Sequence, residues 1–240
     1  MRASPNLTKF RPLSMIKQRV VPAGQRRVTI PFGVFRGLVF NIDFRSQTQF
    51  YLGLWEFETH PCIRYALKRA QWMIDAGAGH GELCVLFGRN ACPAIAIEPD
   101  TTALSVLYAN MSLNGLSGSN ISVLPKYVGT SLDRDHIRLD AVEVDRSKPG
   151  FIKIDIEGFE TDALQSAKAL LDEADVTLLI EVHSRELETD CIAILSRHGY
   201  TCRIIDNSRW RRFIPERRLV SHNRWIWADR DLNSAHMRGS

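Results

Sequence analysis

The chain has 240 residues, of which 45% are hydrophobic and 24% charged, a composition typical of a globular protein with a sizeable core. Its formal net charge of +4 is too weak on its own to indicate nucleic-acid binding. The five cysteines are odd in number and none are spaced C-x-x-C, which argues against a disulfide framework or a structural zinc site and favours reduced thiols in a cytoplasmic protein.

The two ends of the chain are expected to lie outside the folded domain. Residues 1–24 are polar and basic and lack the apolar core of a signal peptide, so we predict a flexible N-terminus without a secretory signal. Residues 236–240 resemble sequence left by cloning. No apolar run approaches the roughly 18 residues of a transmembrane helix, so no membrane-spanning segment is predicted.

Residues 25–70 predict an N-terminal extension made of a strand pair and a helix. The strands are expected at 27–30 and 38–44, with glycines between them, and the helix at 51–70.

Short apolar runs then alternate with helical patterns from residue 71 to residue 231. Strands are expected at 72–76, 94–97, 121–124, 151–156, 176–182, 200–205 and 225–228. Helices are expected at 81–87, 101–113, 160–172 and 187–197. Unbroken apolar strands that alternate with helices predict a doubly wound, mostly parallel, seven-stranded Rossmann-like α/β sheet. The last two strands have no helix between them and should form an antiparallel C-terminal hairpin at one edge.

A glycine-rich turn follows the first strand of this domain and opens a helix. Residues 75–81 read Asp-Ala-Gly-Ala-Gly-His-Gly. Glycines allow a cofactor to lie against bare main chain, because they have no Cβ and can adopt positive φ. Their G-x-G-x-G spacing does not fit the dinucleotide pattern G-x-G-x-x-G, and phosphate-loop spacing is absent. The carboxylate of Asp75 suits a cationic ligand, such as the ammonium group of a methionine moiety.

Glu98-Pro99-Asp100 ends the second strand of the domain, 17 residues after Gly81. A carboxylate at this place can accept hydrogen bonds from both ribose hydroxyls of an adenosine cofactor. A tight turn with a solvated glutamate is the structural alternative. The adenosine part of either a dinucleotide or S-adenosyl-L-methionine would suit Glu98, and the glycine spacing together with Asp75 favours S-adenosyl-L-methionine as the cofactor. A nicotinamide-dependent oxidoreductase remains an alternative, against which the glycine spacing argues.

The fourth strand of the domain carries charges among isoleucines. Period-2 alternation places Lys153, Asp155 and Glu157 on one face, and Asp155 is a candidate partner for Lys153. Charges on a central strand cost several kcal/mol per ion unless paired, so they indicate a functional site. An edge strand with one solvated face is the alternative. His183 ends the fifth strand after Glu181, where it can act as a general base or as a structural hydrogen-bonding group.

Taken together, these motifs resemble the FkbM-type methyltransferases of the class I S-adenosylmethionine-dependent fold. The resemblance is carried by segments 49–56, 75–81, 97–100, 153–160 and 181–183, with Asn110 and Asn114. It implies O-methylation of a hydroxyl on a sugar, a polyketide or a related small metabolite. The positions that it assigns to the cofactor are Glu56, Asp75, Gly77, Ala78, Gly79, His80, Gly81, Glu98, Pro99 and Asp155. The family's turn commonly reads G-A-N-x-G, and Gly79 stands here in place of the Asn.

The expected catalytic residues are Lys153, Asp155, Glu157 and His183. Asp155 is the first candidate for the general base and His183 the second. Glu157 and Glu160 are expected to position substrate hydroxyls or to support the loop, and a charge at Glu160 is also favoured by a helix N-terminus. Asp155, Glu157 and His183 could hold a divalent cation, but no spacing requires one.

Other readings of the sequence are weaker. The arginine-rich segment 209–218 could bind an acidic substrate, RNA or a lipid head group, or form a solvated loop. Nucleic-acid methylation is disfavoured, because 155–158 reads Asp-Ile-Glu-Gly where amino-group methylases carry Asn/Asp-Pro-Pro-aromatic. A cofactor-binding module without catalysis is the alternative outside enzymology. The sequence does not specify the methyl acceptor or the oligomeric state.

Overall fold

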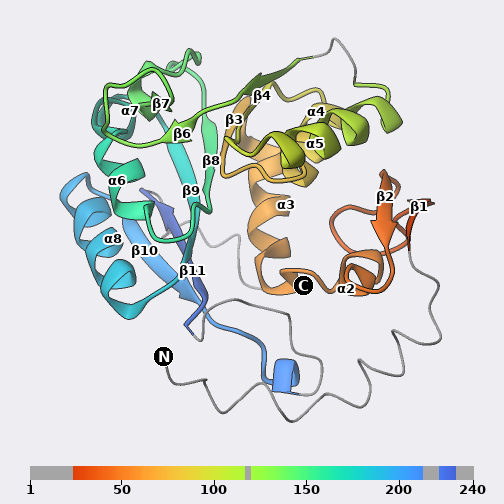
Figure 1. The fold of residues 1–240 in the computed structure, drawn as a ribbon. Helices are drawn as coiled ribbons and strands as arrows, with labels where there is room; N and C mark the ends of the chain where they lie inside the picture. The colour runs from red at the N-terminus through yellow and green to blue at the C-terminus, as the bar shows by residue number, and fades with distance from the viewer. Residues whose placement is uncertain (1–23, 117–119, 213–221, 231–240) are drawn as a thin grey trace, which may run out of the picture. The chain divides into compact units, whose positions relative to one another are not determined.

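The computed structural model describes residues 24–116, 120–212 and 222–230, and the predictions for residues 1–23 and 236–240 lie outside this part (Figure 1). The chain divides between Trp55 and Glu56 into two compact units. All five cysteines lie in the described part and are free thiols. No helix in this part combines the length and apolar character that crossing a bilayer requires.

The first unit contains the predicted strand pair. Strands β1 (Gln25–Thr29) and β2 (Val39–Asp43) pair antiparallel, and helix α2 (Thr48–Tyr51) follows. The Phe50 ring packs edge-on against Phe40, with ring centroids 5.1 Å apart. Packing of these aromatic rings anchors α2 to the strand pair.

The prediction of a single helix over residues 51–70 is wrong. A short 3-10 turn, η2 (Phe57–Thr59), and helix α3 (His60–Arg69) occupy only residues 57–69 of this range. Glu56 adopts a left-handed conformation with φ of 43°, which a continuous helix does not allow. Pro61 lies in the first turn of α3, where the missing N–H has no helical partner to lose.

In the part of the chain that the structure describes, seven strands of the second unit form one sheet in the order β10-β11-β9-β8-β3-β4-β5. Their bounds are β3 Trp72–Ala76, β4 Ala94–Ile97, β5 Ile121–Leu124, β8 Gly150–Ile154, β9 Val176–Val182, β10 Thr201–Ile205 and β11 Arg224–Asp229. The five neighbouring strands from β9 to β5 pair in parallel, and β11 is antiparallel to both of its neighbours. The predicted sheet and C-terminal hairpin are thus confirmed. Strand β8 is central, so the edge-strand alternative is excluded.

Helices cover both faces of this sheet, with α3, α4 and α5 on one side and α6, α7 and α8 on the other (Figure 1). Their bounds are α4 Glu82–Arg89, α5 Thr101–Leu113, α6 Glu160–Gln165, α7 Lys168–Glu173 and α8 Arg185–Arg197. The helix predicted at 160–172 is therefore two short helices. The buried Ser166 hydroxyl donates to the Ala163 carbonyl and accepts from the Leu139 N–H, which favours a break between them.

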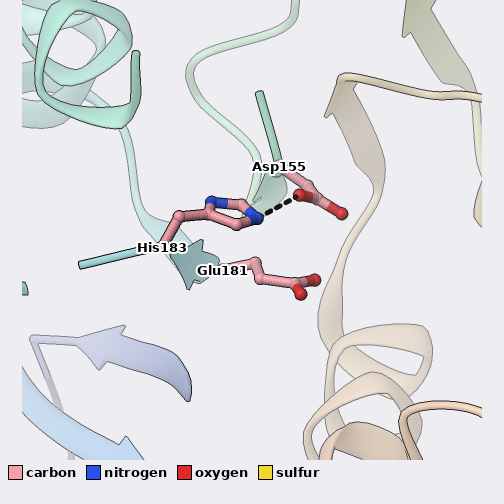
Figure 2. A group of neighbouring side chains, drawn as sticks. All are labelled: Asp155, Glu181 and His183. Atoms are coloured by element: carbon pink, nitrogen blue, oxygen red, sulfur yellow. Dashed lines mark ion pairs between the residues drawn. The ribbon is translucent and has the colours of Figure 1, made fainter. Parts of the chain in front are cut away.

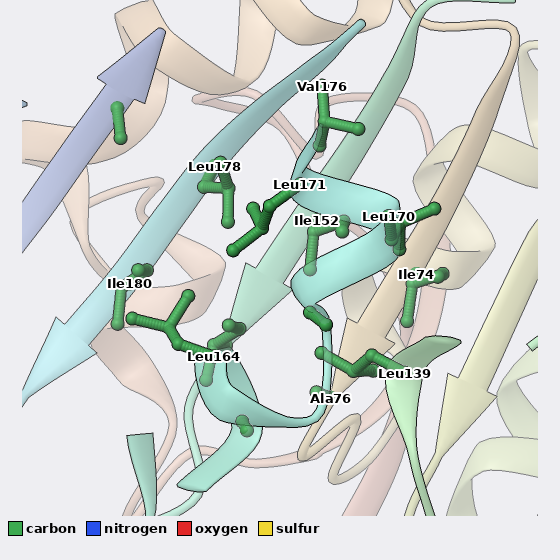
Figure 3. Close-up of a cluster of buried hydrophobic side chains, with 14 of the residues drawn as sticks. Ile74, Ala76, Leu139, Ile152, Leu164, Leu170, Leu171, Val176, Leu178 and Ile180 are labelled. Atoms are coloured by element: carbon green, nitrogen blue, oxygen red, sulfur yellow. The ribbon is translucent and has the colours of Figure 1, made fainter. Parts of the chain in front are cut away.

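A dense apolar core lies between the sheet and helices α6 and α7 (Figure 3). The inward side chains include Ile74, Ile152, Leu164, Leu170, Leu171, Leu178 and Ile180. Burial of each such side chain contributes about 1.5–3 kcal/mol. On the opposite face, the Phe151 ring stacks on Phe87 at 5.4 Å. Because five of the strands pair in parallel, their carboxyl ends lie at the same edge of the sheet.

Three short elements between β5 and β8 were not predicted. They are β6 (Tyr127–Val128), β7 (His136–Ile137) and the 3-10 turn η3 (Leu139–Ala141). The two strands pair parallel over two residues each, which is too short for any hydrophobic periodicity.

Candidate active site

The glycine turn connects β3 to α4, and its glycines adopt conformations that other residues avoid. Gly77, Gly79 and Gly81 have φ of 81°, 51° and 76°. A Cβ on Gly77 would lie 1.8 Å from the carbonyl oxygen of Asp155, and one on Gly81 would lie 2.6 Å from Cγ of Leu107. A Cβ on Gly79 would meet nothing within 4 Å. Gly77 and Gly81 therefore permit close packing, whereas Gly79 leaves open main chain.

Glu98 shapes the glycine turn from the end of β4. Its Oε2 accepts from the Gly79 N–H at 2.8 Å, and its Oε1 accepts from the Asp100 N–H at 2.9 Å. Each carboxylate oxygen keeps a second acceptor site, so the ribose role of Glu98 stays a prediction. On the far side of the turn, the Asn110 amide donates to the His80 carbonyl at 2.9 Å. The His80 side chain itself is exposed.

Asp75 is buried beneath the turn at 3% exposure and lies opposite Lys153 in the register of β3 and β8. The Cys84 thiol is 3.6 Å from its Oδ2. Burial raises the pKa of the Asp75 carboxyl to about 7, although attraction to Lys153 acts in the other direction. Its role as partner of an ammonium group stays a prediction.

Lys153 forms the centre of a buried ion-pair network. Its Nζ lies 3.0 Å from Asp155 Oδ2, which confirms the expected pairing, and 4.0 Å from Glu181 Oε2. Burial lowers the pKa of Lys153, but attraction to Asp155, Glu56 and Glu181 outweighs it and raises the net value. Burial raises the pKa of Asp155, yet the Lys153 ammonium brings it below its usual range. The pair is therefore ionised, and Asp155 is a weak base.

His183 lies beside this pair at the carboxyl end of β9 (Figure 2). Its Nε2 is 3.7 Å from Asp155 Oδ1, and its Nδ1 is 2.7 Å from Glu160 Oε1. The hydrogen bond to Glu160 is the main reason that the pKa of His183 is raised, and burial acts against it. The Glu160 carboxylate thus orients the imidazole ring, and the Nε2 atom of the ring faces the Asp155 carboxylate.

The predicted alternation of charges fails beyond Ile154, where β8 ends. Glu157 adopts a left-handed conformation with φ of 43°, and its side chain is exposed. The structure therefore places Glu157 in the turn after the strand, and Glu181 joins Asp155 and His183 in its stead.

Sequence reasoning missed two partners of Glu181. The Asn223 amide donates to its Oε1, and the Trp225 indole N–H donates to its Oε2 at 3.3 Å. Trp225 lies opposite Glu181 in the antiparallel register of β11 and β9. That register was not readable from the sequence, although a tryptophan on a buried strand would have suggested a polar partner.

Asp155, Glu181 and His183 also meet the basic requirement for a cation site. Each offers one ligand atom, and these atoms lie within 4.8 Å of one another. Carboxylate and imidazole ligands suit a divalent cation. However, the ammonium of Lys153 already supplies a positive charge to both carboxylates. The arrangement is best described as an ion-pair network around a lysine.

The arginine-rich segment begins with the 3-10 turn η4 (Arg209–Arg212), and residues 213–218 lie outside the described part. The solvated-loop interpretation is wrong for Arg211, whose Nη2 is 2.6 Å from Glu58 Oε2 in a buried ion pair. The Trp210 ring packs edge-on against Phe57. This segment is therefore anchored to η2 by both charge and aromatic packing.

The Glu58–Arg211 pair predicts an acid-sensitive contribution to stability. Burial alone would raise the pKa of Glu58, but hydrogen bonds with Arg211 and Ser208 lower it from 4.5 to about 2. A depressed carboxyl pKa stabilises the fold above the unfolded value and loses this effect as pH falls towards 2. The shift corresponds to about 3 kcal/mol. In urea titrations, the stability difference between wild type and Glu58→Gln should shrink from pH 6 to pH 3, and an unchanged difference would contradict this assignment.

Comparison with known proteins identifies the class of this fold and site. The model of the FkbM methyltransferase domain matches residues 53–217, so the chain belongs to the FkbM methyltransferase family. Methyltransferase FkbM from Methylobacillus flagellatus KT is 25% identical, with a TM-score of 0.50 over 66% of this chain and 43% of that chain. This chain therefore spans less than half the length of that protein.

Two further solved structures are less similar to this chain. A SAM-dependent O-methyltransferase from Thermotoga maritima is 13% identical, with a TM-score of 0.47 over 70% of this chain and 62% of that one. A putative methyltransferase from Streptococcus mutans in complex with SAH is 10% identical, with a TM-score of 0.49 over 70% of this chain and 94% of that one. No match was found among curated proteins.

Proposed function

We propose that this protein transfers the methyl group of S-adenosylmethionine to a hydroxyl of a sugar, glycan or other small metabolite. The observation that carries the proposal is the direct contact between the glycine turn and Asp155. The Asp155 N–H donates to the Ala76 carbonyl at 2.9 Å, and Gly77 packs directly against the Asp155 carbonyl. A cofactor on the glycine turn would therefore lie beside Asp155 and His183. Membership of a methyltransferase family supports the same conclusion.

The cofactor-binding part of this proposal rests on bare main chain flanked by acidic groups. Gly79 presents open main chain, Glu98 holds the turn, and Asp75 lies beneath it. This environment suits a nucleoside with a cationic tail better than a pyrophosphate, which the Glu98 carboxylate at the turn would repel. Glu56, whose charge acts on Lys153, is a further candidate contact for the cofactor.

In the proposed reaction, the hydroxyl oxygen attacks the methyl carbon as the carbon–sulfur bond breaks. S-adenosylhomocysteine leaves as a neutral thioether, and the hydroxyl proton passes to a base. His183 suits this role better than Asp155, because the Lys153 ammonium holds the pKa of Asp155 low while the pKa of His183 is raised. Asp155 then serves to hold Lys153 and to face the second ring nitrogen of His183.

The test is transfer from labelled S-adenosylmethionine to panels of nucleotide sugars, glycans and polyketides. Replacement His183→Gln should lower kcat by roughly 10²–10⁴-fold with little change in cofactor affinity. Asp155→Asn should also lose activity, through disruption of the Lys153 pair. A chelator should leave the rate unchanged. Full activity of His183→Gln would exclude it as the base, and cofactor binding without transfer to any acceptor would indicate a binding module instead.

A further inference from the structure

Glu160 is the first residue of α6, yet its side chain is completely buried. A favourable interaction with a helix N-terminus requires no burial, since it operates at the surface. Removing a carboxylate from water costs several kcal/mol unless specific partners replace the solvent. The helix N-terminus therefore does not explain why Glu160 is buried. Its burial indicates that a specific group in the protein binds the carboxylate.

That partner is His183. Glu160 Oε1 accepts from His183 Nδ1 at 2.7 Å and from the Gly158 N–H at 3.0 Å. Gly158 has φ of 103° and follows the left-handed Glu157, so an unusual turn carries its N–H to the carboxylate. The turn after β8 and the end of β9 are thus joined through one oxygen atom of Glu160.

This contact determines which nitrogen of His183 is available. An ionised carboxylate can only accept hydrogen bonds, so the proton of the neutral imidazole must reside on Nδ1. Nε2 then carries the free lone pair and faces Asp155 Oδ1 at 3.7 Å. The other Glu160 oxygen, Oε2, is buried and has no hydrogen-bond partner among the described residues. The bonds to Oε1 are therefore its main compensation for lost solvent.

The charged groups around His183 come from three elements. Glu160 approaches from α6, Glu181 lies on β9, and Asp155 follows β8 together with the Lys153 ammonium bound to it. Of these groups, Glu160 hydrogen-bonds to the imidazole at 2.7 Å, and this bond is the largest cause of the raised pKa of His183. Loss of Glu160 should therefore change both the orientation and the proton affinity of the ring.

We propose that Glu160 is the positioning residue of this transferase, which holds His183 in the tautomer and orientation that leave Nε2 to accept the hydroxyl proton. The inference rests on the proposed function. As the methyl group moves to the hydroxyl oxygen, the proton passes to Nε2, and the imidazolium that forms is stabilised by the Glu160 carboxylate at Nδ1. Glu160 does not touch the substrate and acts through His183 alone.

The experiment compares Glu160→Gln, Glu160→Asp and the matched control Asp162→Asn. Asp162 is another acidic residue of α6, but its carboxylate binds the Thr130 hydroxyl at 2.6 Å instead of the site. Rates of methyl transfer are measured against pH, and the His183 ring is titrated by NMR in each variant. Circular dichroism checks that each variant is folded. If Glu160→Gln does not fold, the comparison is made with Glu160→Asp, which keeps the charge.

Glu160→Gln should lower kcat about 100-fold with KM little changed. The rate should also reach its plateau at lower pH, because the group that raises the pKa of His183 is gone. Glu160→Asp should restore part of the rate, and Asp162→Asn should leave the His183 titration unchanged. An unaltered His183 titration in Glu160→Gln, or an equal rate loss in Asp162→Asn, would overturn the proposal. The NMR titration needs no turnover, so absence of transfer in the wild type would refute the proposed function separately.

Discussion

Gly77→Ala is expected to abolish cofactor binding and to destabilise the fold by at least about 2 kcal/mol. The added Cβ would lie 1.8 Å from the Asp155 carbonyl oxygen, which belongs to main chain and cannot rotate away. The φ of 81° adds strain for any residue with a side chain. Urea titration would measure the stability loss, and calorimetry with S-adenosylmethionine would measure binding.

Gly79→Ala is the matched control for this prediction. Its Cβ would meet nothing within 4 Å, so only the left-handed conformation is penalised, at about 1–2 kcal/mol. Stability should fall less than in Gly77→Ala, but affinity for the cofactor should still drop, since the new methyl group occupies main chain that the ligand needs. Wild-type affinity in Gly79→Ala would show that the cofactor does not lie against this part of the turn.

Lys153→Met is expected to cost about 3–5 kcal/mol of stability at neutral pH, because it removes the ammonium from the half-buried Asp155 and the buried Glu181. In the variant, the pKa of these carboxyls should rise above their unfolded values. A carboxyl pKa that is raised in the folded state means that stability is lost as pH increases. The stability difference between wild type and Lys153→Met should therefore be smaller at pH 5 than at pH 7.5.

Urea titration of Lys153→Met at both pH values checks this expectation. Lys168→Met is the control, because Lys168 is exposed at the start of α7 and its replacement should change stability by at most about 0.5 kcal/mol. A loss below about 1 kcal/mol in Lys153→Met, or a deficit that does not vary with pH, would show that the ammonium is not required to balance the carboxylates.

The parallel sheet was predictable because its strands are short, apolar and separated by regular helices. The bounds of β4, β5, β9 and α5 agree with the residue ranges expected from the sequence. The two helices that were predicted wrongly are interrupted by local features that hydrophobic periodicity does not reveal. A left-handed Glu56 interrupts the helix expected at 51–70, and the Ser166 hydroxyl interrupts the one expected at 160–172.

The site was predictable where charge appears in an apolar context. Lys153 and Asp155 stood out in a predicted strand whose other residues are Phe151 and three isoleucines, and they do form a pair. The remaining contacts depend on tertiary geometry. Asn223 and Trp225 reach Glu181 through strand register, and Glu160 reaches His183 through the irregular turn after β8. Neither relationship leaves a signal in residue spacing.

Calorimetric titration of the wild-type protein with S-adenosylmethionine and with S-adenosylhomocysteine is the most direct test of the role assigned to residues 77–81. One site per chain is expected for both compounds, together with a thermal stabilisation that grows with ligand concentration and is absent with NADH. No heat and no stabilisation from either nucleoside, in a protein shown to be folded, would contradict it.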